Sequence, residues 1–163
     1  MKKVGIVMGS DSDLPIVSKA VDTLRAFGVP CEVHVYSAHR TPAEAAEFAR
    51  GAEQNGFGVL IAAAGMAAHL AGAIAAQTTL PVIGIPCQSN TLDGIDALLS
   101  TVQMPSGIPV ATVAINGAAN AALLSVEILA LSEPALASKL KEKRVKDHAA
   151  VLEKDRAIMD RLD

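Results

Sequence analysis

The chain has 163 residues, 51% of them hydrophobic, and a formal net charge of −3. This length suits one domain that buries roughly 70% of the surface of its unfolded chain. The acidic balance argues against a nucleic-acid partner, and one Tyr, three Phe and no Trp argue against a flavin sandwich. No charged N-terminal region followed by a long apolar segment is present in the sequence, so we expect no signal peptide and no membrane span. Cys31 and Cys87 lack metal spacing and fit buried thiols of a cytoplasmic protein.

Short apolar runs alternate with helical patterns along the chain. The expected strands cover residues 4–8, 31–36, 58–63, 81–86 and 110–115. The expected helices cover residues 14–27, 42–54 and 67–77. This alternation predicts right-handed crossovers and a parallel sheet covered on both faces. The nearly continuous apolar strands agree, because strands of such a sheet are buried on both sides.

The tail after Pro134 has its own amphipathic pattern. Apolar residues recur there at near-helical spacing among many charges: Leu136, Leu140, Val145, Ala149, Leu152, Met159 and Leu162. We therefore divide the chain into a catalytic domain over 1–132 and a helix over 133–163. We expect this helix to pack on a neighbouring subunit, and packing back on its own sheet is the alternative.

The polar loops of the predicted sheet all follow the ends of strands. These loops cover residues 9–13, 37–40, 64–69 and 87–90. Parallel α/β sheets bind ligands beyond the carboxyl ends of their strands, so we expect one shared rim.

Residues 37–42 (SAHRTP) carry the most information about chemistry. Thr41 can cap a helix that starts at Pro42, and a helix start beside a strand end suits an anionic ligand. Arg40 can hold a phosphate, and His39 can move a proton near neutral pH. The pair predicts chemistry on a phosphorylated substrate.

The loop over 9–13 (GSDSD) lies where a phosphate loop would be, but it matches neither a dinucleotide fingerprint nor a P-loop. Its hydroxyls can bind phosphate and Asp13 can accept from ribose hydroxyls; a cluster that only caps a helix is the alternative. A receiver domain is excluded, because the third and fifth strands end without the required Asp and Lys. The small residues over 62–76 serve either close helix packing or close approach to a ligand.

The four histidines differ in their surroundings. His34 falls inside a strand and is interpreted as structural, whereas His148 falls on the charged tail and is interpreted as solvated. His39 and His69 both fall on the rim. No ligand-spaced Cys/His set predicts a metal, and no nucleophile elbow predicts covalent hydrolysis.

Several motifs together resemble the bacterial class I branch of the aminoimidazole ribonucleotide carboxylase family. These enzymes of purine biosynthesis are the 5-(carboxyamino)imidazole ribonucleotide mutases. The resemblance spans about residues 4 to 130 and rests on segments 9–13, 37–42, 67–70, 81–86, 92–94, 102–105 and 114–124. It implies a flavodoxin-like three-layer sandwich with a parallel sheet of about five strands and a C-terminal helical extension. It also implies a cytoplasmic homo-octamer that needs no cofactor or metal, with a small ribonucleotide as substrate and neither nucleic acid nor membrane as partner.

The resemblance further implies an isomerase that moves a carboxylate from the exocyclic nitrogen to ring carbon 4 through enclosed carbon dioxide. His39 would be the general acid/base, Ser10 and Arg40 would hold the phosphate, and Asp13 would hold the ribose. Ser37 would be a further substrate contact. The loop from Gly65 to His69 would enclose the base and the carboxylate. Further contacts are expected from Ser12, Ala64, Met66, Ala67 and Leu70.

Two alternative functions stay open. The carboxylase branch uses free carbon dioxide, and the resemblance implies that it differs by Lys in place of Arg40 and by lacking segment 67–70. The second alternative is a non-catalytic nucleotide-binding module with the same fold. Departures from the commonest mutase pattern occur at Met66, Ala71 and Ser106, where Gly, Pro and Arg are usual.

Overall fold

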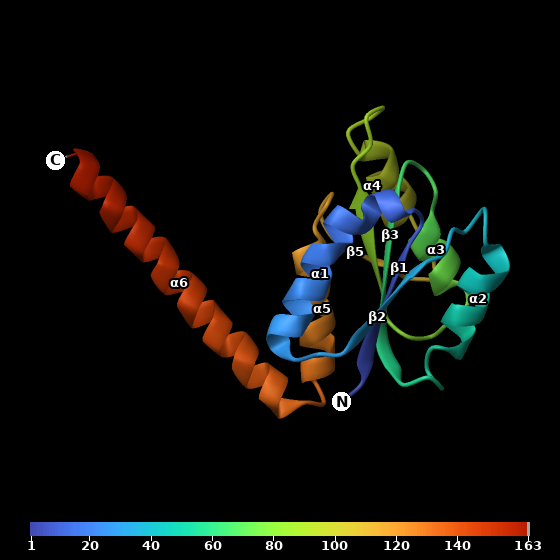
Figure 1. The fold of residues 1–163 in the computed structure, drawn as a ribbon, viewed down its shortest axis with the longest axis horizontal. Helices are drawn as coiled ribbons and strands as arrows, with labels where there is room; N and C mark the ends of the chain where they lie inside the picture. Colours follow the sequence, from blue (N-terminus) through green and yellow to red (C-terminus); the bar gives the residue numbers. More distant parts are fainter. Residues whose placement is uncertain (163) are drawn as a thin grey trace.

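Five parallel strands lie side by side in the order β2-β1-β3-β4-β5 at the centre of the fold (Figure 1). The computed structural model describes residues 1–162, and Asp163, the last residue of the expected C-terminal helix, lies outside the described residues. The strands are β1 (Lys3–Met8), β2 (Cys31–Val35), β3 (Phe57–Gly65), β4 (Val82–Cys87) and β5 (Ala111–Thr112). This strand order is that of flavodoxin-like proteins, so the predicted fold class is confirmed.

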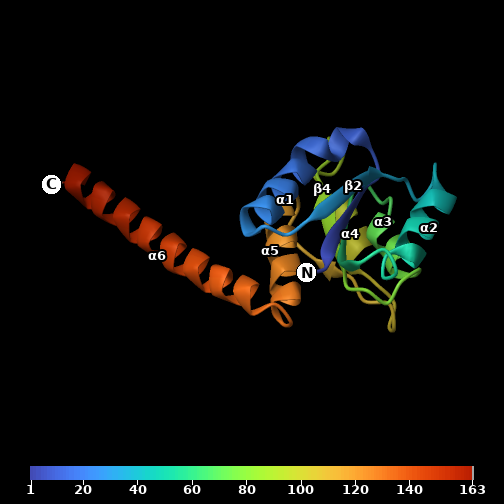
Figure 2. The same ribbon diagram turned by 60° about the horizontal axis from the view of Figure 1, so that its bottom comes forward.

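Helices cover both faces of the sheet (Figure 2). The connecting segments are η1 (Asp11–Asp13), α1 (Leu14–Phe27), α2 (Pro42–Gly51), α3 (Leu70–Ala75), α4 (Ile95–Val102), α5 (Ala118–Ala130) and α6 (Pro134–Leu162). One buried cluster joins α1 and α5 to the sheet, and a second joins α2 and α3 to its other face. Helix α4 lies on the second face, because Thr101 contacts β4 at Gly84 beside Ala71 of α3. The result is a three-layer sandwich.

Local sequence signals set some boundaries and miss others. Helix α1 has the predicted bounds and ends at Gly28, which adopts the left-handed conformation (φ +73°) that glycine takes without strain. Helix α3 is shorter than predicted, because the loop before it turns sharply and His69 is itself left-handed (φ +58°). Strand β5 has only two residues, paired with β4 alone, and is shorter than the predicted strand over 110–115. The sequence pattern predicted neither α4 nor α5.

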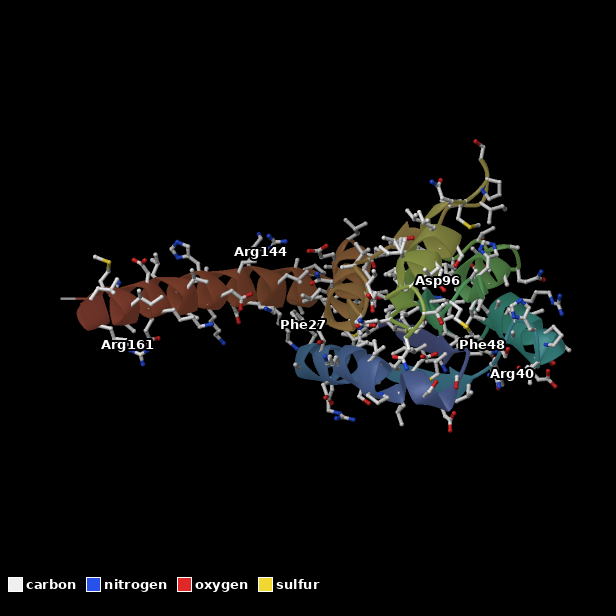
Figure 3. The ribbon with its side chains drawn as sticks, turned by 90° about the horizontal axis from the view of Figure 1, so that it is seen from above. Phe27, Arg40, Phe48, Asp96, Arg144 and Arg161 are labelled. Atoms are coloured by element: carbon white, nitrogen blue, oxygen red, sulfur yellow. The ribbon has the colours of Figure 1, made fainter. Side chains whose placement is uncertain are left out.

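Helix α6 packs on the body only at its beginning. Leu136 is buried against α1 and α5, and Lys139 Nζ donates to the carbonyl of Phe27 (2.8 Å) at the end of α1. Arg144 reaches Glu127 of α5 (3.2 Å), and the helix then runs away from the sheet to Arg161 (Figure 3). The first turns of α6 thus pack on their own chain, and packing of the rest on a neighbouring subunit stays a prediction. None of the helices within residues 1–162 is both long and apolar enough to cross a membrane.

Candidate active site

A cavity of about 510 Å³ opens at the carboxyl ends of β1, β2, β3 and β4. Its walls come from loops far apart in the sequence, as the strand-end argument predicts. The lining residues are Gly9, Ser10, Ser12, Asp13, Ser37, Ala38, His39, Arg40, Ala64, Gly65, Met66, Ala68, Leu70, Gln88 and Ser89. Every predicted site residue except Ala67 and His69 is among them.

The turn after β2 is held by hydroxyl groups. Ser37 Oγ accepts hydrogen bonds from the backbone N–H groups of His39 (3.3 Å) and Arg40 (3.1 Å). Thr41 occupies the N-cap position of α2, but its side chain does not cap the helix; Thr41 Oγ1 accepts instead from the Ser37 N–H (2.8 Å). The predicted capping bond is wrong, because that hydroxyl closes the turn. The turn holds the backbone from which His39 and Arg40 project.

Arg40 links the loops after β1 and β2. Its Nη2 donates to the carbonyl of Gly9 (2.8 Å), and its side chain is otherwise exposed at the cavity. A guanidinium has five N–H donors in a planar fork, so most of them stay free for an anion. Arg40 lies on the side of the molecule opposite to α6 (Figure 3).

His39 is exposed on the same wall. Among residues 1–162, its imidazole makes no hydrogen bond or ion pair. An unengaged imidazole at a cavity surface can accept a proton from a ligand or donate one to it.

The loop after β1 forms a cluster of serines. Ser10 Oγ accepts from the backbone N–H of Ser12 (3.3 Å), and the two hydroxyls lie 2.8 Å apart. Ser10 therefore caps the short helix η1, as the capping alternative predicted. The Ser12 hydroxyl donates its one proton to Ser10 Oγ, so it must rotate before it can donate to a ligand, while its own lone pairs stay free to accept.

Asp13 is the only carboxylate among the described residues that line the cavity. Burial raises the pKa of its carboxyl above the usual value, and the negative charge of Asp11 adds to this, while hydrogen bonding to the Ser10 backbone and the Cys87 thiol opposes it. Burial and the neighbouring Asp13 carboxylate also raise the pKa of the Cys87 thiol to about 12. Cys87 is therefore an uncharged thiol at neutral pH, and it is an unsuitable nucleophile.

The loop after β3 has a strained backbone. Met66 is left-handed (φ +49°) and 62% exposed, a backbone conformation that Gly adopts more readily than Met. His69 does not line the cavity; its Nδ1 lies 2.6 Å from the carbonyl of Ser100 in α4. A carbonyl only accepts, so Nδ1 carries the proton of this bond. The ring lies over Gly72, where an added Cβ would be 2.2 Å from it.

The loop after β4 contributes two lining residues that were not predicted as ligand contacts. Gln88 and Ser89 were placed on the expected rim, but no motif marked them as ligand contacts. Asn116, which follows β5, bonds Gln88 through both ends of its side-chain amide. Ser89 Oγ is buried without a hydrogen-bond partner among residues 1–162.

The site thus combines one guanidinium, one imidazole, one half-buried carboxyl and a wall of small apolar residues. Residues 1–162 hold no group of three His, Cys, Asp or Glu side chains arranged for a metal ion. The cavity has the features of a site for an anionic small molecule with acid–base chemistry.

Comparison with known proteins defines the class to which this site belongs. Residues 3–150 match the AIR carboxylase family, and this chain belongs to that family. The N5-carboxyaminoimidazole ribonucleotide mutase of Thermotoga maritima is 52% identical over 154 residues, covering 94% of this chain and 90% of that protein. The phosphoribosylaminoimidazole carboxylase of Ogataea methanolica is 57% identical over 131 residues, covering 80% of this chain and 24% of that protein. The crystal structure of Treponema denticola PurE aligns with a TM-score of 0.83 at 29% identity, covering 93% and 95% of the two chains.

Proposed function

We propose that this chain is an N5-carboxyaminoimidazole ribonucleotide mutase, an isomerase of purine biosynthesis. The observation that carries the proposal is the convergence of His39, Arg40 and Asp13 on one cavity beside a wall of Ala and Gly. A ribonucleotide needs a cationic phosphate contact and an acceptor for its ribose hydroxyls, and the migration needs a proton carrier. The relative from Thermotoga maritima, which this chain matches over nearly its whole length, bears this activity in its name.

The substrate lies along the strand ends in this proposal. Its phosphate meets the free N–H groups of Arg40, together with the hydroxyls of Ser10, Ser12 and Ser37. Its ribose hydroxyls donate to Asp13. The imidazole base and its carboxylate then reach the wall formed by Ala64 and Gly65 after β3, with Met66, Ala67, Ala68, His69 and Leu70 as the loop that encloses them.

Carboxylate migration needs one bond broken, one bond formed and one proton relayed. The bond between the exocyclic nitrogen and the carboxylate carbon breaks, the nitrogen gains a proton, and carbon dioxide is released inside the cavity. Ring carbon 4 then attacks the carbon dioxide and loses its proton, so no net proton is consumed. His39 delivers the first proton and takes up the second.

The apolar wall supports the intermediate step. Free carbon dioxide escapes or hydrates unless the cavity excludes water. Alanine has only a methyl group and glycine only a hydrogen atom at Cα, so neither residue offers a side-chain nucleophile that would capture carbon dioxide. They also allow close approach of the base to the backbone, because little side-chain volume intervenes.

The mutase is favoured over the carboxylase that uses free carbon dioxide. Arg40 and segment 67–70 match the mutase pattern that the resemblance implies, and this chain covers 90% of the relative named as a mutase but 24% of the fungal relative named as a carboxylase. The decisive assay compares turnover of the carboxyamino substrate with turnover of aminoimidazole ribonucleotide plus bicarbonate. Conversion of the second mixture alone would move this chain to the carboxylase branch.

We also propose that the protein is a cytoplasmic homo-octamer in which α6 packs on a neighbouring subunit. Beyond its first turns, α6 exposes large apolar side chains, including Val145, Val151, Ile158 and Met159. Burying such residues against another chain is favourable, because each removes apolar surface from water. Light scattering on the purified protein tests the assembly size.

A further inference from the structure

Asn116 holds Gln88 at the edge of the cavity by two hydrogen bonds. The backbone N–H of Gln88 donates to Asn116 Oδ1 (2.9 Å), and Asn116 Nδ2 donates to Gln88 Oε1 (3.2 Å). The backbone N–H of Asn116 also donates to the carbonyl of Pro86 (2.9 Å). Asn116 adopts a left-handed conformation (φ +58°), which Asn tolerates better than most residues. The residue after β5 thus fastens the loop after β4.

These bonds determine the orientation of both amides. A backbone N–H can only donate, so the Asn116 atom that faces it must be the carbonyl oxygen. The other end of Asn116 is then an NH₂ group, which must meet the oxygen of the Gln88 amide. Consequently the Gln88 Nε2 group faces away from Asn116, and within residues 1–162 it has no hydrogen-bond partner. Gln88 therefore has two N–H donors free for a ligand, while its Oε1 is engaged by Asn116.

The place of Gln88 in the sheet determines which part of a ligand it can meet. Arg40 is tied to Gly9 at the end of β1, whereas Gln88 follows β4. Two strand spacings separate β1 from β4, a distance of about 10 Å. A nucleotide whose phosphate binds Arg40 and whose base follows the cavity along the strand ends would bring that base toward Gln88. Among the described residues lining the cavity, Arg40 is the only Lys or Arg, so a second anionic group at the far end meets neutral donors.

We infer that Gln88 binds the migrating carboxylate of the substrate through its Nε2 donors, and that Asn116 is a positioning residue that keeps those donors turned into the cavity. The inference rests on the proposed function. A neutral donor suits a group that must become carbon dioxide, because a cation there would stabilise the ground-state carboxylate and oppose its loss. An amide already held in one orientation also loses less side-chain conformational entropy when it binds a ligand.

The test measures dissociation constants by calorimetry for two nucleotides, 4-carboxy-5-aminoimidazole ribonucleotide and aminoimidazole ribonucleotide, which lacks the carboxylate. Gln88→Glu keeps the acceptor for Asn116 but replaces the donors with an anionic oxygen. We expect the dissociation constant of the carboxylated nucleotide to rise roughly tenfold or more, and that of aminoimidazole ribonucleotide to stay unchanged. Gln54→Glu makes the same chemical change at an exposed position outside the cavity lining and should change neither constant.

Asn116→Asp separates positioning from folding. Asp keeps an acceptor for the Gln88 N–H but has no donor, so it draws Gln88 Nε2 toward itself and turns Oε1 into the cavity. The same selective loss is expected, with a normal melting temperature. Equal weakening of both nucleotides, or no change in the ratio of their constants, would overturn the inference. If the wild-type protein binds neither nucleotide, the proposed function is overturned as well. If the wild-type protein turns over the substrate but both variants keep the wild-type ratio of the two dissociation constants, only the inference is overturned.

Discussion

Replacing Arg40 with alanine tests the phosphate contact directly. Arg40 is exposed and makes one hydrogen bond within residues 1–162, to the carbonyl of Gly9 (2.8 Å). Of the five N–H groups of its guanidinium, the remaining ones face solvent or ligand. Arg40→Ala therefore removes ligand contacts and disturbs little of the fold, so we expect the free energy of unfolding to change by less than about 1 kcal/mol.

The cost to substrate binding follows from the charge of the partner. Hydrogen bonds between a guanidinium and a phosphate are charge-assisted, and losing them costs about 2–3 kcal/mol. This corresponds to a rise in KM of about 30- to 150-fold. The phosphate takes no part in bond breaking, so its binding energy is the same in ground and transition states, and kcat should stay unchanged.

Steady-state kinetics with the carboxyamino substrate measures both constants. Arg50→Ala is a matched control, because Arg50 also makes one side-chain hydrogen bond, to Gln77 Oε1 (2.9 Å), and does not line the cavity. Unchanged KM in Arg40→Ala would refute the phosphate contact. A fall in kcat at constant KM would refute it too, and would place Arg40 at the reacting atoms.

Other variants probe separate parts of the molecule. His39→Asn should abolish turnover while calorimetry finds nucleotide affinity preserved; full activity would exclude the acid–base role. Asp13→Asn should raise the melting temperature at neutral pH, because the raised pKa of the Asp13 carboxyl means that its charged form destabilises the fold. The gain should vanish in acid, below the usual Asp pKa of 3.8, where the carboxyl is neutral in both the folded and the unfolded chain. A gain that stays constant with pH would contradict burial as the cause. Gly84→Ala would put a Cβ 2.3 Å from Thr101 Cγ2 and should destabilise by about 1–3 kcal/mol in denaturant titration, whereas Gly9→Ala, with no heavy atom nearer than 3.7 Å, should not. Deleting residues 144–163 spares the contacts of Leu136 and Lys139, so the body should stay folded while light scattering reports a smaller assembly; an unchanged assembly would contradict packing of α6 on a neighbour.

Local chemistry explains why much of the site could be predicted. The side-chain period and the glycine at position 28 indicate α1 without reference to any other element. Parallel strands end on one side of a sheet, so polar loops after β1, β2 and β3 had to meet. That rule alone brings Ser10, His39 and Gly65 to one cavity.

Interactions between distant segments could not be predicted in the same way. Thr41 was expected to cap α2, but the hydroxyl closes the turn at Ser37 because the chain bends back there. His69 was expected to face the ligand, and its assignment as a ligand contact stays a prediction; its Nδ1 is engaged by the Ser100 carbonyl of α4. Helices α4 and α5 themselves were not predicted.

The sequence by itself determined the fold class, the rim on which ligands bind and the pairing of an imidazole with a guanidinium. These follow from periodicity and from residues adjacent in the chain. The tertiary structure alone decided which side chains have free hydrogen-bonding groups. Asn116 and Gln88 are 28 residues apart, and only the pairing of β4 with β5 brings one amide against the other. Whether a donor is available to a ligand depends on which hydrogen-bonding groups already have partners in the folded chain, and those partners are known only from the whole structure.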